Sequence, residues 1–489
     1  MIILVNPLAA KWRYRIPLSI LSIGSAIEGI YPYEIVDGNL DKSIKNTLHR
    51  LIEERNIRYV GFTVMPGPQL YQAIQLSKSI KKRFPTVKII WGGYFSSLHK
   101  TVTLQADYVD FVIRSQGDYS FLQLIRTLES GGSLESIKGL SYKNEAIRHN
   151  PDQELIDPNT LTPLPYHKVN ISRYIGKTYL GTKTVNYHSS VGCPFLCGFC
   201  AVAAVYQARW MGLTPERITN DLLWFRDNYQ INAVEFVDNN FFTSEHRTHE
   251  FADRINGKGI TWWGEARPDT LLQYADSTLK LMKQSGSKMI FLGVESSSQK
   301  VLRFMNKGGT QTPDTALALA DKMRGIGIIP EFSFVLGTPS DTVEEDLEQD
   351  LQYIRQLKQI NPECEIVIYV CSPVFFEAAE LYQAASAFGF AYPSKLDDWL
   401  LPHWQRHDLR KNPVTPWLKD RLRIRIKNFE RVLNAYFPTK SDLKLTTMQH
   451  RILHFLGSWR YRLSLYDFAY EVALIQKLVR YRQPEIEGF

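Results

Sequence analysis

The sequence lacks any apolar run long enough to cross a membrane as a helix. Such a helix takes about 18 or more consecutive apolar residues, and no stretch of these 489 residues approaches that length. Residues 1–17 also lack a basic region ahead of their apolar residues, so we expect a buried first strand there rather than a signal peptide. These absences predict a cytoplasmic protein whose only membrane contact would be peripheral.

Cysteine is scarce, with five residues in the whole chain and none before Cys193. Three of the five fall within eight residues, and the other two are Cys364 and Cys371. An odd number in this arrangement argues against a secreted disulfide framework. It favours a reducing compartment, where thiolates are available to bind metal.

The composition and the net charge exclude few classes of protein. Hydrophobic residues make up 44% of the chain and charged residues 22%, as in ordinary globular proteins. The formal net charge is +8, and much of the basic excess lies toward the C-terminus. A basic surface serves nucleic acid, anionic lipid or simple solubility alike. We expect no nucleic-acid partner.

The first 125 residues alternate short apolar stretches with helical ones. This alternation predicts a parallel sheet with helices on both faces, a doubly wound Rossmann-like α/β domain. Helices are expected at 41–55 and 69–84, among others. The expected strands are 2–6, 33–37, 59–64, 87–92 and 111–114.

Small or turn-forming residues stand at the ends of three of these strands. Ligands of such sheets lie at the carboxyl ends of the strands, and glycine lets the backbone pass close to a bulky ligand. The candidate ligand-binding residues of this domain are Thr63, Gly92, Gly93, Gly117 and Asp118.

The rest of the chain divides into three parts. Residues 126–182 lose the alternation and are predicted to form a linker with a small extension. From 183 to 394 the alternation returns as six βα units, which predicts a partial (βα)6 barrel with its site at the C-terminal ends of the strands. Residues 395–489 are predicted to be a helical region. The expected barrel strands are 184–189, 233–237, 260–263, 289–294, 331–336 and 365–371.

Cys193, Cys197 and Cys200 follow the first expected barrel strand with the spacing C-x3-C-x2-C. Iron–sulfur clusters are held by cysteine thiolates, normally four of them. Three thiolates on one loop cap three irons of a cube and leave the fourth iron open, as in catalytic metal sites. The alternative is a structural zinc site with His188 as fourth ligand. Zinc sites usually pair two cysteine knuckles, and the chain has no second knuckle.

This spacing, with the aromatic Phe199 before the last cysteine, resembles the signature of radical S-adenosylmethionine enzymes. The resemblance implies a [4Fe–4S] cluster whose fourth iron binds the amino and carboxylate groups of S-adenosylmethionine. An electron from the cluster would then cleave the sulfonium and release a 5′-deoxyadenosyl radical. A reductase, a flavodoxin or a ferredoxin is expected as the electron donor.

Four further segments resemble the same family at the ends of the second to fifth barrel strands. Each match is weak alone, because carboxylates at strand ends are often N-caps of the next helix. Their order behind one cysteine motif implies that they surround S-adenosylmethionine. With Phe199, the candidate residues are Asp238, Asn239, Glu265, Arg267, Glu295, Ser296 and Gly337.

A doubly wound domain ahead of the barrel is, in this family, usually a cobalamin-binding domain. Gly117 and Asp118 stand where related proteins carry a Gly-Glu pair. The D-x-H-x-x-G motif that supplies a histidine to cobalt in other cobalamin proteins is absent, and residues 37–39 hold no histidine. The resemblance implies cobalamin bound without a protein imidazole, or a domain that has lost the cofactor.

Cobalamin beside a deoxyadenosyl radical implies methylation of an unreactive carbon in a small-molecule or lipid-like substrate. Relatives also close a ring on a magnesium porphyrin or rearrange rings, and a sensor without turnover is a further alternative. A methylthiotransferase acting on RNA would carry extra N-terminal cysteines, which this chain lacks. Residues 372–377 depart from the Pro-Gly-Thr usual in the family, so the substrate pocket stays unassigned.

Two C-terminal segments, 417–427 and 459–463, alternate basic and apolar residues. Such a segment can lie on an anionic bilayer, or it can pack on the barrel while its arginines reach solvent. His403 and His407 are spaced i, i+4, and without a further ligand we interpret them as structural or substrate-lining residues.

Overall fold

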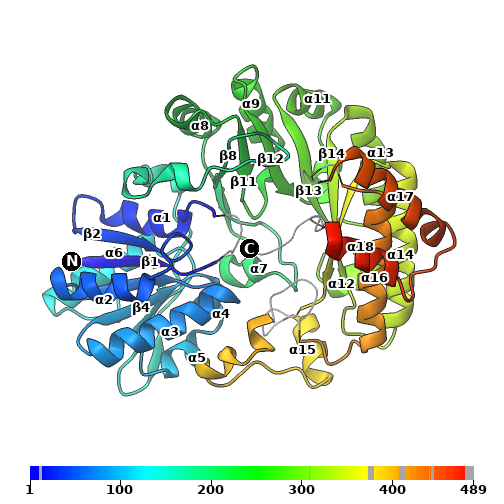
Figure 1. Cartoon of the computed structure of the whole chain (residues 1–489). Helices are drawn as coiled ribbons and strands as arrows, with labels where there is room; N and C mark the ends of the chain where they lie inside the picture. The colour runs from blue at the N-terminus through cyan, green and yellow to red at the C-terminus, as the bar shows by residue number, and fades with distance from the viewer. Residues whose placement is uncertain are drawn as a thin grey trace.

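A computed structural model shows two parallel sheets joined by short connections and followed by C-terminal helices (Figure 1). The structure describes residues 1–9, 14–307, 309–372, 379–406, 414–439, 441 and 445–479. Two features singled out from the sequence, residues 373–377 and His407, lie outside the described residues.

The first sheet confirms the five parallel strands expected from the sequence. Their order is β2-β1-β3-β4-β5. Two further strands extend this sheet, β6 antiparallel to β5 and β7 antiparallel to β6. Strands joined through crossover helices in this order place helices on both faces. The strands are β1 (Ile2–Asn6), β2 (Tyr33–Asp37), β3 (Tyr59–Thr63), β4 (Lys88–Gly92), β5 (Phe111–Ile113), β6 (Leu140–Lys143) and β7 (Ile147–His149).

Alternate residues of the central strand β1 pack into two separate cores, because successive side chains of a strand point to opposite faces. Ile3 and Val5 belong to the core on one side of the sheet, whereas Leu4 packs with Ile20 and Phe121 on the other. The helices of this part are α1 (Leu18–Ile27), α2 (Ile44–Glu54), α3 (Pro68–Arg83), α4 (Tyr94–Leu98), α5 (Lys100–Gln105) and α6 (Asp118–Ser130).

The stretch expected to be a linker contains regular structure. Helix α6 continues past residue 125, and β6 and β7 extend the first sheet. Three 3₁₀ turns then carry the chain to the second sheet: Pro158–Thr160, Tyr166–Lys168 and Ile171–Arg173.

The second sheet has six parallel strands in consecutive order, which confirms the strand number expected from the sequence. β8 and β15 lie at its two edges. The strands are β8 (Thr184–Tyr187), β11 (Ala233–Phe236), β12 (Thr261–Ala266), β13 (Ser287–Glu295), β14 (Ile329–Leu336) and β15 (Glu365–Val370). A separate antiparallel pair, β9 (Ser190–Gly192) and β10 (Trp210–Gly212), follows β8.

Helices follow the strands of the second sheet as the alternation predicts. They are α7 (Ala201–Tyr206), α8 (Pro215–Tyr229), α9 (Glu245–Ile255), α10 (Pro268–Leu272), α11 (Asp276–Gln284), α12 (Gln299–Phe304), α13 (Pro313–Ile326), α14 (Val343–Ile360) and α15 (Glu380–Ala387).

The two sheets are joined by polar contacts as well as by the chain. The Asn186 amide of β8 accepts a hydrogen bond from the backbone N–H of Ile16 at 2.8 Å and donates to its carbonyl at 3.3 Å. Tyr94 at the start of α4 donates to Asn239 at 3.3 Å. Because Asn186 is buried, these bonds fix the first sheet against the edge strand of the second.

The C-terminal region forms α16 (Asp420–Tyr436), α17 (Thr447–Arg462) and α18 (Tyr470–Val479) beside α14 (Figure 1). Trp417 is buried and donates to the carbonyl of Gly337 at 2.8 Å. Arg421 and Arg425 form ion pairs with glutamates of α14. Segment 417–427 therefore packs on the second sheet and its helices. No helix in the described part of the chain combines the length and apolar character needed to cross a bilayer.

Candidate functional site

The three clustered cysteines lie on the connection between β9 and β10. Gly192 ends β9 with φ +80°, and a Cβ there would meet the carbonyl oxygen of Arg209 at 2.1 Å. The backbone N–H of Cys193 donates to that carbonyl at 3.1 Å. Glycine at 192 thus allows the start of the cysteine loop to lie close to Arg209, which precedes β10.

A second segment, immediately after α12, holds the cysteine loop from the other side. The N–H of Gly198 donates to the carbonyl of Met305 at 2.8 Å, and the Asn306 amide donates to the carbonyl of Leu196 at 2.7 Å. Both bonds leave the cysteine side chains free. The loop is therefore fixed through its backbone, as a cluster-binding loop requires.

All three clustered cysteines are free thiols, and burial raises the pKa of two of them. For Cys193 the backbone of Phe195 and the side chain of Asn240 oppose that rise, and for Cys200 burial raises the pKa to about 12. Bound iron would favour the thiolate form. Cys364 and Cys371 are wholly buried at opposite ends of β15, away from this loop in sequence and in the sheet.

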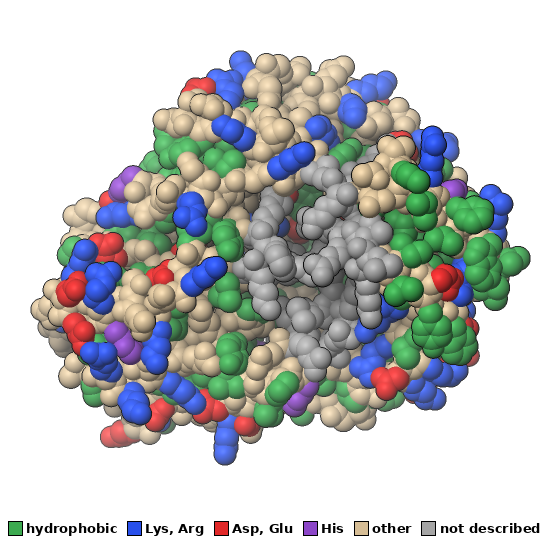
Figure 2. All heavy atoms as spheres, in the orientation of Figure 1, with side chains coloured by type: hydrophobic (Ala, Val, Ile, Leu, Met, Phe, Trp, Pro, Cys, Tyr) green, Lys and Arg blue, Asp and Glu red, His purple; other side chains and the backbone are tan. Residues whose placement is uncertain are grey.

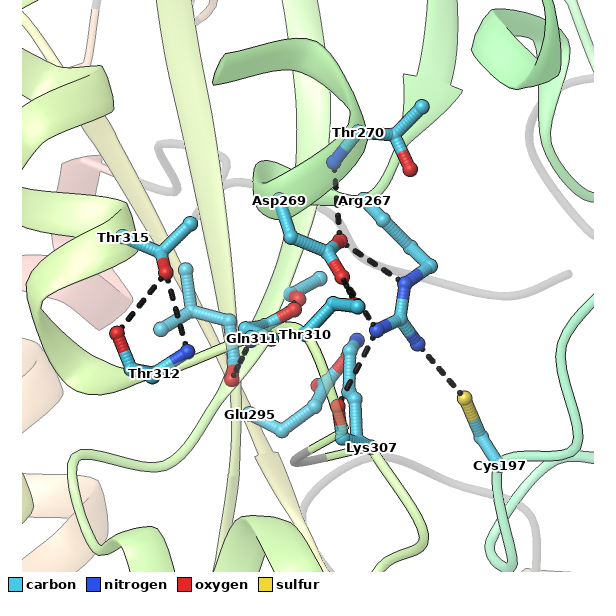
Figure 3. Close-up of polar contacts among 12 residues, drawn as sticks. Cys197, Arg267, Asp269, Thr270, Glu295, Lys307, Thr310, Gln311, Thr312 and Thr315 are labelled. Carbon is cyan, nitrogen blue, oxygen red and sulfur yellow. Dashed lines mark hydrogen bonds and ion pairs between the residues drawn. The ribbon is translucent and has the colours of Figure 1, made fainter. Parts of the chain in front are cut away.

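Arg267, which follows β12, directs its guanidinium at the cysteine loop (Figure 3). Its Nη1 donates to the Sγ of Cys197 at 3.4 Å, and the guanidinium lies over the Phe195 ring, 4.0 Å from its centroid. Asp269 pairs with the same guanidinium at 2.8 Å and accepts a bond from Thr310. This buried pair holds one positive N–H group against a cluster-ligand sulfur.

Glu295 ends β13 and forms a buried ion pair with Lys307 (Figure 3). Oε1 of Glu295 lies 2.5 Å from Nζ of Lys307, which is itself 5.7 Å from the Phe199 ring centroid. Glu295 has φ +71°, unusual for a residue other than glycine. A Cβ at Gly293 would meet both charged groups of the pair, so glycine leaves room for it.

Glu265 points away from the helices that cover the second sheet. In β12 the odd-numbered residues 261, 263 and 265 keep partial exposure while the even ones are buried, so Glu265 faces the opposite side. Burial raises its pKa to about 7; the charge of Arg15 opposes the rise and Asp238 adds to it. Both the protonated and the ionised form of Glu265 are therefore populated near neutral pH.

Other candidate residues at the strand ends make structural contacts. Asp238 is buried and accepts bonds from the backbone and hydroxyl of Ser189 and from the hydroxyl of Ser190. The hydroxyl of Ser296 donates to Asp350 at 3.0 Å. Gly337, with φ +75°, packs against Leu418. In this structure these three residues support the surrounding loops.

All five candidate residues of the first sheet line one cavity of about 310 Å³. The cavity lies at the carboxyl ends of β3, β4 and β5 and is closed on its other side by residues 187–191, which lead into the cysteine loop. It also extends between the first sheet and its helices α1 and α6. Its lining includes Thr63, Gly92, Gly93, Gly117 and Asp118, together with Leu4, Gly61, Phe121, Tyr94, Tyr206 and His188.

Two of these residues have geometry suited to a ligand at the strand ends. Gly93 has φ +93°, and a Cβ there would meet the backbone of Val64 at 2.8 Å, so the position requires glycine. Asp118 is almost fully buried and accepts a bond from Ser22; burial raises the pKa of its carboxyl. At these two positions the cavity wall is thus formed by glycine backbone and by a short, buried side chain.

The sequence interpretation missed three residues of the site: Asp269, Lys307 and Asn240. Lys307 lies in a segment compared with the family, but its ion pair with Glu295 closes across twelve residues without a local pattern. Asn240 is buried beside Cys193. Its neighbours Asp238 and Asn239 were selected, so its position in the same turn was the available signal.

The thiols are not arranged around a single ion. Among the residues that the structure describes, no three His, Cys, Asp or Glu side chains are grouped closely enough to hold one metal ion. The described residues include His188 and the three cysteines, so the zinc arrangement considered from the sequence is not found there.

Comparison with known proteins connects this geometry to a family. Residues 187–354 match the model of the Radical SAM superfamily. The chain is 28% identical over 346 residues to an uncharacterized methyltransferase, PH0819, of Pyrococcus horikoshii, covering 70% of this chain and 73% of that protein. It is 25% identical over 302 residues to the anaerobic magnesium-protoporphyrin IX monomethyl ester cyclase of Synechocystis, covering 60% of this chain and only 58% of the cyclase.

A solved structure resembles the whole fold. The cobalamin-dependent S-adenosylmethionine radical enzyme OxsB, with aqua-cobalamin bound, superposes with a TM-score of 0.64 at 16% identity. The match covers 98% of this chain and 75% of that one. At this identity the likeness shows that the fold is shared.

Proposed function

We propose that this chain, a member of the radical S-adenosylmethionine superfamily, is a cobalamin-dependent enzyme that methylates an unactivated carbon of a small-molecule or lipid-like substrate. One observation carries the proposal: a single cavity joins the strand ends of the first sheet to the segment that leads into the cysteine loop. A ligand in that cavity would lie next to chemistry at the cluster. The methyltransferase named among the relatives supports the reaction class.

Cys193, Cys197 and Cys200 would hold the [4Fe–4S] cluster, whose chemistry is to supply one electron that cleaves S-adenosylmethionine. The described contacts fit this role, because the backbone of the loop is held by Met305 and the Asn306 amide, and Arg267 aims an N–H at a ligand sulfur. Glu295 and Glu265 would hold the methionyl ammonium. Arg267 is buried against the cysteine loop and Lys307 is buried against Glu295.

Thr63, Gly92, Gly93, Gly117 and Asp118 would hold cobalamin, whose chemistry is to carry a methyl group. The lining of the cavity suits a ligand that comes close to the backbone, since Gly92, Gly93 and Gly117 line it and an apolar branch runs past Leu4, Gly61 and Phe121. Gly61 lacks the Cβ that would otherwise meet Leu4 and Phe121 at 3.2 Å. A reductase, flavodoxin or ferredoxin would supply the electron.

The activity test uses the full chain, reconstituted anaerobically with iron, sulfide and cobalamin. With S-adenosylmethionine and dithionite we expect 5′-deoxyadenosine, because the radical takes a hydrogen atom from the medium when no substrate is present. We also expect S-adenosylhomocysteine, because cobalamin reduced by dithionite accepts the methyl group of a second molecule. Protein reconstituted without cobalamin should give only 5′-deoxyadenosine. Equal S-adenosylhomocysteine from both preparations would contradict the role of cobalamin.

The cobalamin site is tested separately by electron paramagnetic resonance of the cobalt(II) form. We expect no superhyperfine splitting from a protein nitrogen. His188 lines the cavity and is the matched probe. A splitting that disappears in His188→Ala would contradict binding without a protein imidazole.

A second candidate is ring closure of the kind carried out by the Synechocystis relative. The sequence similarity to that cyclase favours it. Release of 5′-deoxyadenosine without any S-adenosylhomocysteine, in protein containing cobalamin, would support this reaction over methylation.

A further inference from the structure

Helix α17 carries an apolar stripe on the face that does not pack on the protein. Phe455 is 75% exposed, and residues spaced by three or four positions along one face are exposed with it. The surface continues through the following turn into α18, where Phe468 is 71% exposed. The exposed apolar residues are Met448, Ile452, Phe455, Trp459, Leu463, Leu465, Phe468, Tyr470 and Leu474. We call this set the α17–α18 surface.

The opposite face of α17 packs closely on the protein. The exposed stripe is therefore not the face by which this helix packs on the rest of the chain. A Cβ at Gly457 would meet the backbone N of Tyr436 in α16 at 2.9 Å, which shows how closely the two helices approach. His454 bonds to the carbonyl of Tyr436 at 2.6 Å, and Tyr461 stacks on the Tyr436 ring at 4.7 Å. α17 is thus apolar on two faces, and one of them points outward.

The charges at the α17–α18 surface are unbalanced in favour of positive ones. Arg451 and Arg462 are exposed, lie on the same helix face as the stripe, and form no ion pair with any residue that the structure describes. Within the described residues 445–479 the two acidic residues are already paired, Glu471 with Arg460 at 3.0 Å and Asp467 with Arg425 at 3.5 Å. The free charges of this surface are therefore cationic.

Figure 2 shows the same feature from outside. Hydrophobic side chains gather at the right of the molecule, where Figure 1 places α17 and α18, and Lys and Arg side chains border them. A contiguous exposed apolar area of this kind marks an interaction site. Aromatic and long aliphatic side chains beside arginine suit the boundary between lipid headgroups and acyl chains.

We propose that the α17–α18 surface docks the protein on the surface of an anionic lipid bilayer. Apolar side chains would enter the acyl region while Arg451 and Arg462 meet the headgroup phosphates. Charge favours this occupant over a second copy of the chain. A symmetric pairing of the same face would bring these arginines together without acidic partners. The proposal is independent of the proposed activity.

Flotation of the full chain with vesicles tests the docking. We expect binding to phosphatidylcholine vesicles that contain about one third phosphatidylglycerol, and at least tenfold weaker binding to pure phosphatidylcholine. The variants Phe455→Ser, Phe468→Ser and Arg451→Glu, Arg462→Glu should each reduce anionic binding at least tenfold. All four positions are exposed, so melting temperature should be unchanged.

Matched controls change the same chemistry elsewhere on the surface. Ile30→Ser, Leu401→Ser removes two exposed apolar residues, and Lys42→Glu, Lys45→Glu reverses two exposed charges, one just before α2 and one in its first turn. Both should bind like the parent. Binding lost equally in the control and test charge variants would show a general charge effect and overturn the assignment to this surface.

The position of contact is read from tryptophan quenching by brominated lipid. Quenching in anionic vesicles should fall clearly in Trp459→Phe. Unchanged quenching would overturn the proposal, as would vesicle binding unaffected by the Phe455 and Phe468 changes. Concentration-dependent dimers without vesicles, dissolved by Phe455→Ser, Phe468→Ser, would assign the surface to a second copy instead.

Discussion

The guanidinium of Arg267 places a positive charge next to a cluster ligand, and that position has a redox consequence. A donor at the Sγ of Cys197 favours the reduced cluster, which is the more negative state. We expect Arg267→Gln to lower the midpoint potential. A difference of about 1.4 kcal/mol between the oxidation states is about 59 mV for one electron, so a shift of roughly 30–100 mV is expected. Potentiometric titration followed by electron paramagnetic resonance measures it.

The partner of this arginine provides the control. Asp269 neutralises the guanidinium, so Asp269→Asn should leave the potential unchanged or raise it. Shifts of the same sign in both variants would show that the pair acts only by holding the loop in place.

The two groups of cysteines should respond oppositely to substitution. Replacing Cys193, Cys197 and Cys200 by Ala should remove iron, sulfide and cluster absorbance from the reconstituted protein. The double variant Cys364→Ala, Cys371→Ala should keep about four irons per chain, as expected for one [4Fe–4S] cluster. Since both of these residues are wholly buried, that variant should melt at a lower temperature. Loss of the cluster from the double variant would contradict the ligand assignment.

Glu265 makes stability depend on pH in a predictable direction. Its pKa is raised by burial from 4.5 to about 7, so between these values the folded protein holds a proton that the unfolded chain has released. The free energy of unfolding should therefore fall as pH rises from about 4.5 to about 7, by at most about 1.4 kcal/mol per pH unit, and level off above. Glu265→Gln should flatten this slope in urea titrations. A slope unchanged by the substitution would assign it to other groups, such as Asp350, whose pKa burial also raises to about 7.

At the scale of elements, one ion pair joins the end of β13 to the segment after α12. Removing one partner of a buried pair leaves an uncompensated charge and costs roughly 3–5 kcal/mol. Lys307→Met should lower the free energy of unfolding by about that much. The double variant Glu295→Gln, Lys307→Met should recover part of the loss, because no buried charge remains. Chemical denaturation of the four proteins of this cycle measures the coupling.

Variants of the Glu295–Lys307 pair also test ligand binding separately from stability. If Glu295 holds S-adenosylmethionine, the ligand should raise the melting temperature of the parent protein more than that of the Glu295→Gln, Lys307→Met variant. An equal increase in both would limit the pair to a structural role.

The parallel strands could be predicted because each is a short, nearly continuous apolar stretch between helical ones. β6 and β7 were missed because they are short antiparallel strands, of four and three residues, at one end of the sheet and in a segment rich in turn residues. β9 and β10 were missed for the same reason of length. Local pattern identifies strands that are buried on both faces and fails for short strands at an edge.

The candidate site was predictable where a motif has fixed spacing, as in the cysteine loop and the glycine-bearing strand ends. Residues chosen only by position after a strand were harder to assign. The partners of Ser296 and Asp238 are Asp350, far along the chain, and Ser189. Such contacts depend on tertiary packing, which leaves no periodic signal in the sequence.

At the scale of the whole molecule, Asn186 makes one of the contacts that couple the two sheets. Its amide satisfies both backbone groups of Ile16, and removing it leaves a buried N–H and carbonyl unpaired at a cost of about 1–3 kcal/mol for each group. In calorimetry we expect a single unfolding transition for the parent. Asn186→Ala should separate it into two, one for each sheet. A single transition at a lower temperature would show that other contacts suffice for the coupling.

The cavity has one wall from residues 4–121 and the other from residues 158–221. The cavity therefore forms only when both sheets have folded and come together. A large molecule held there would contact both sheets, so we expect it to exchange faster when they part. Retention of such a ligand through dilution and gel filtration would then reflect the rate at which the sheets part. Asn186→Ala would shorten the residence time of the ligand by weakening the contact between the sheets.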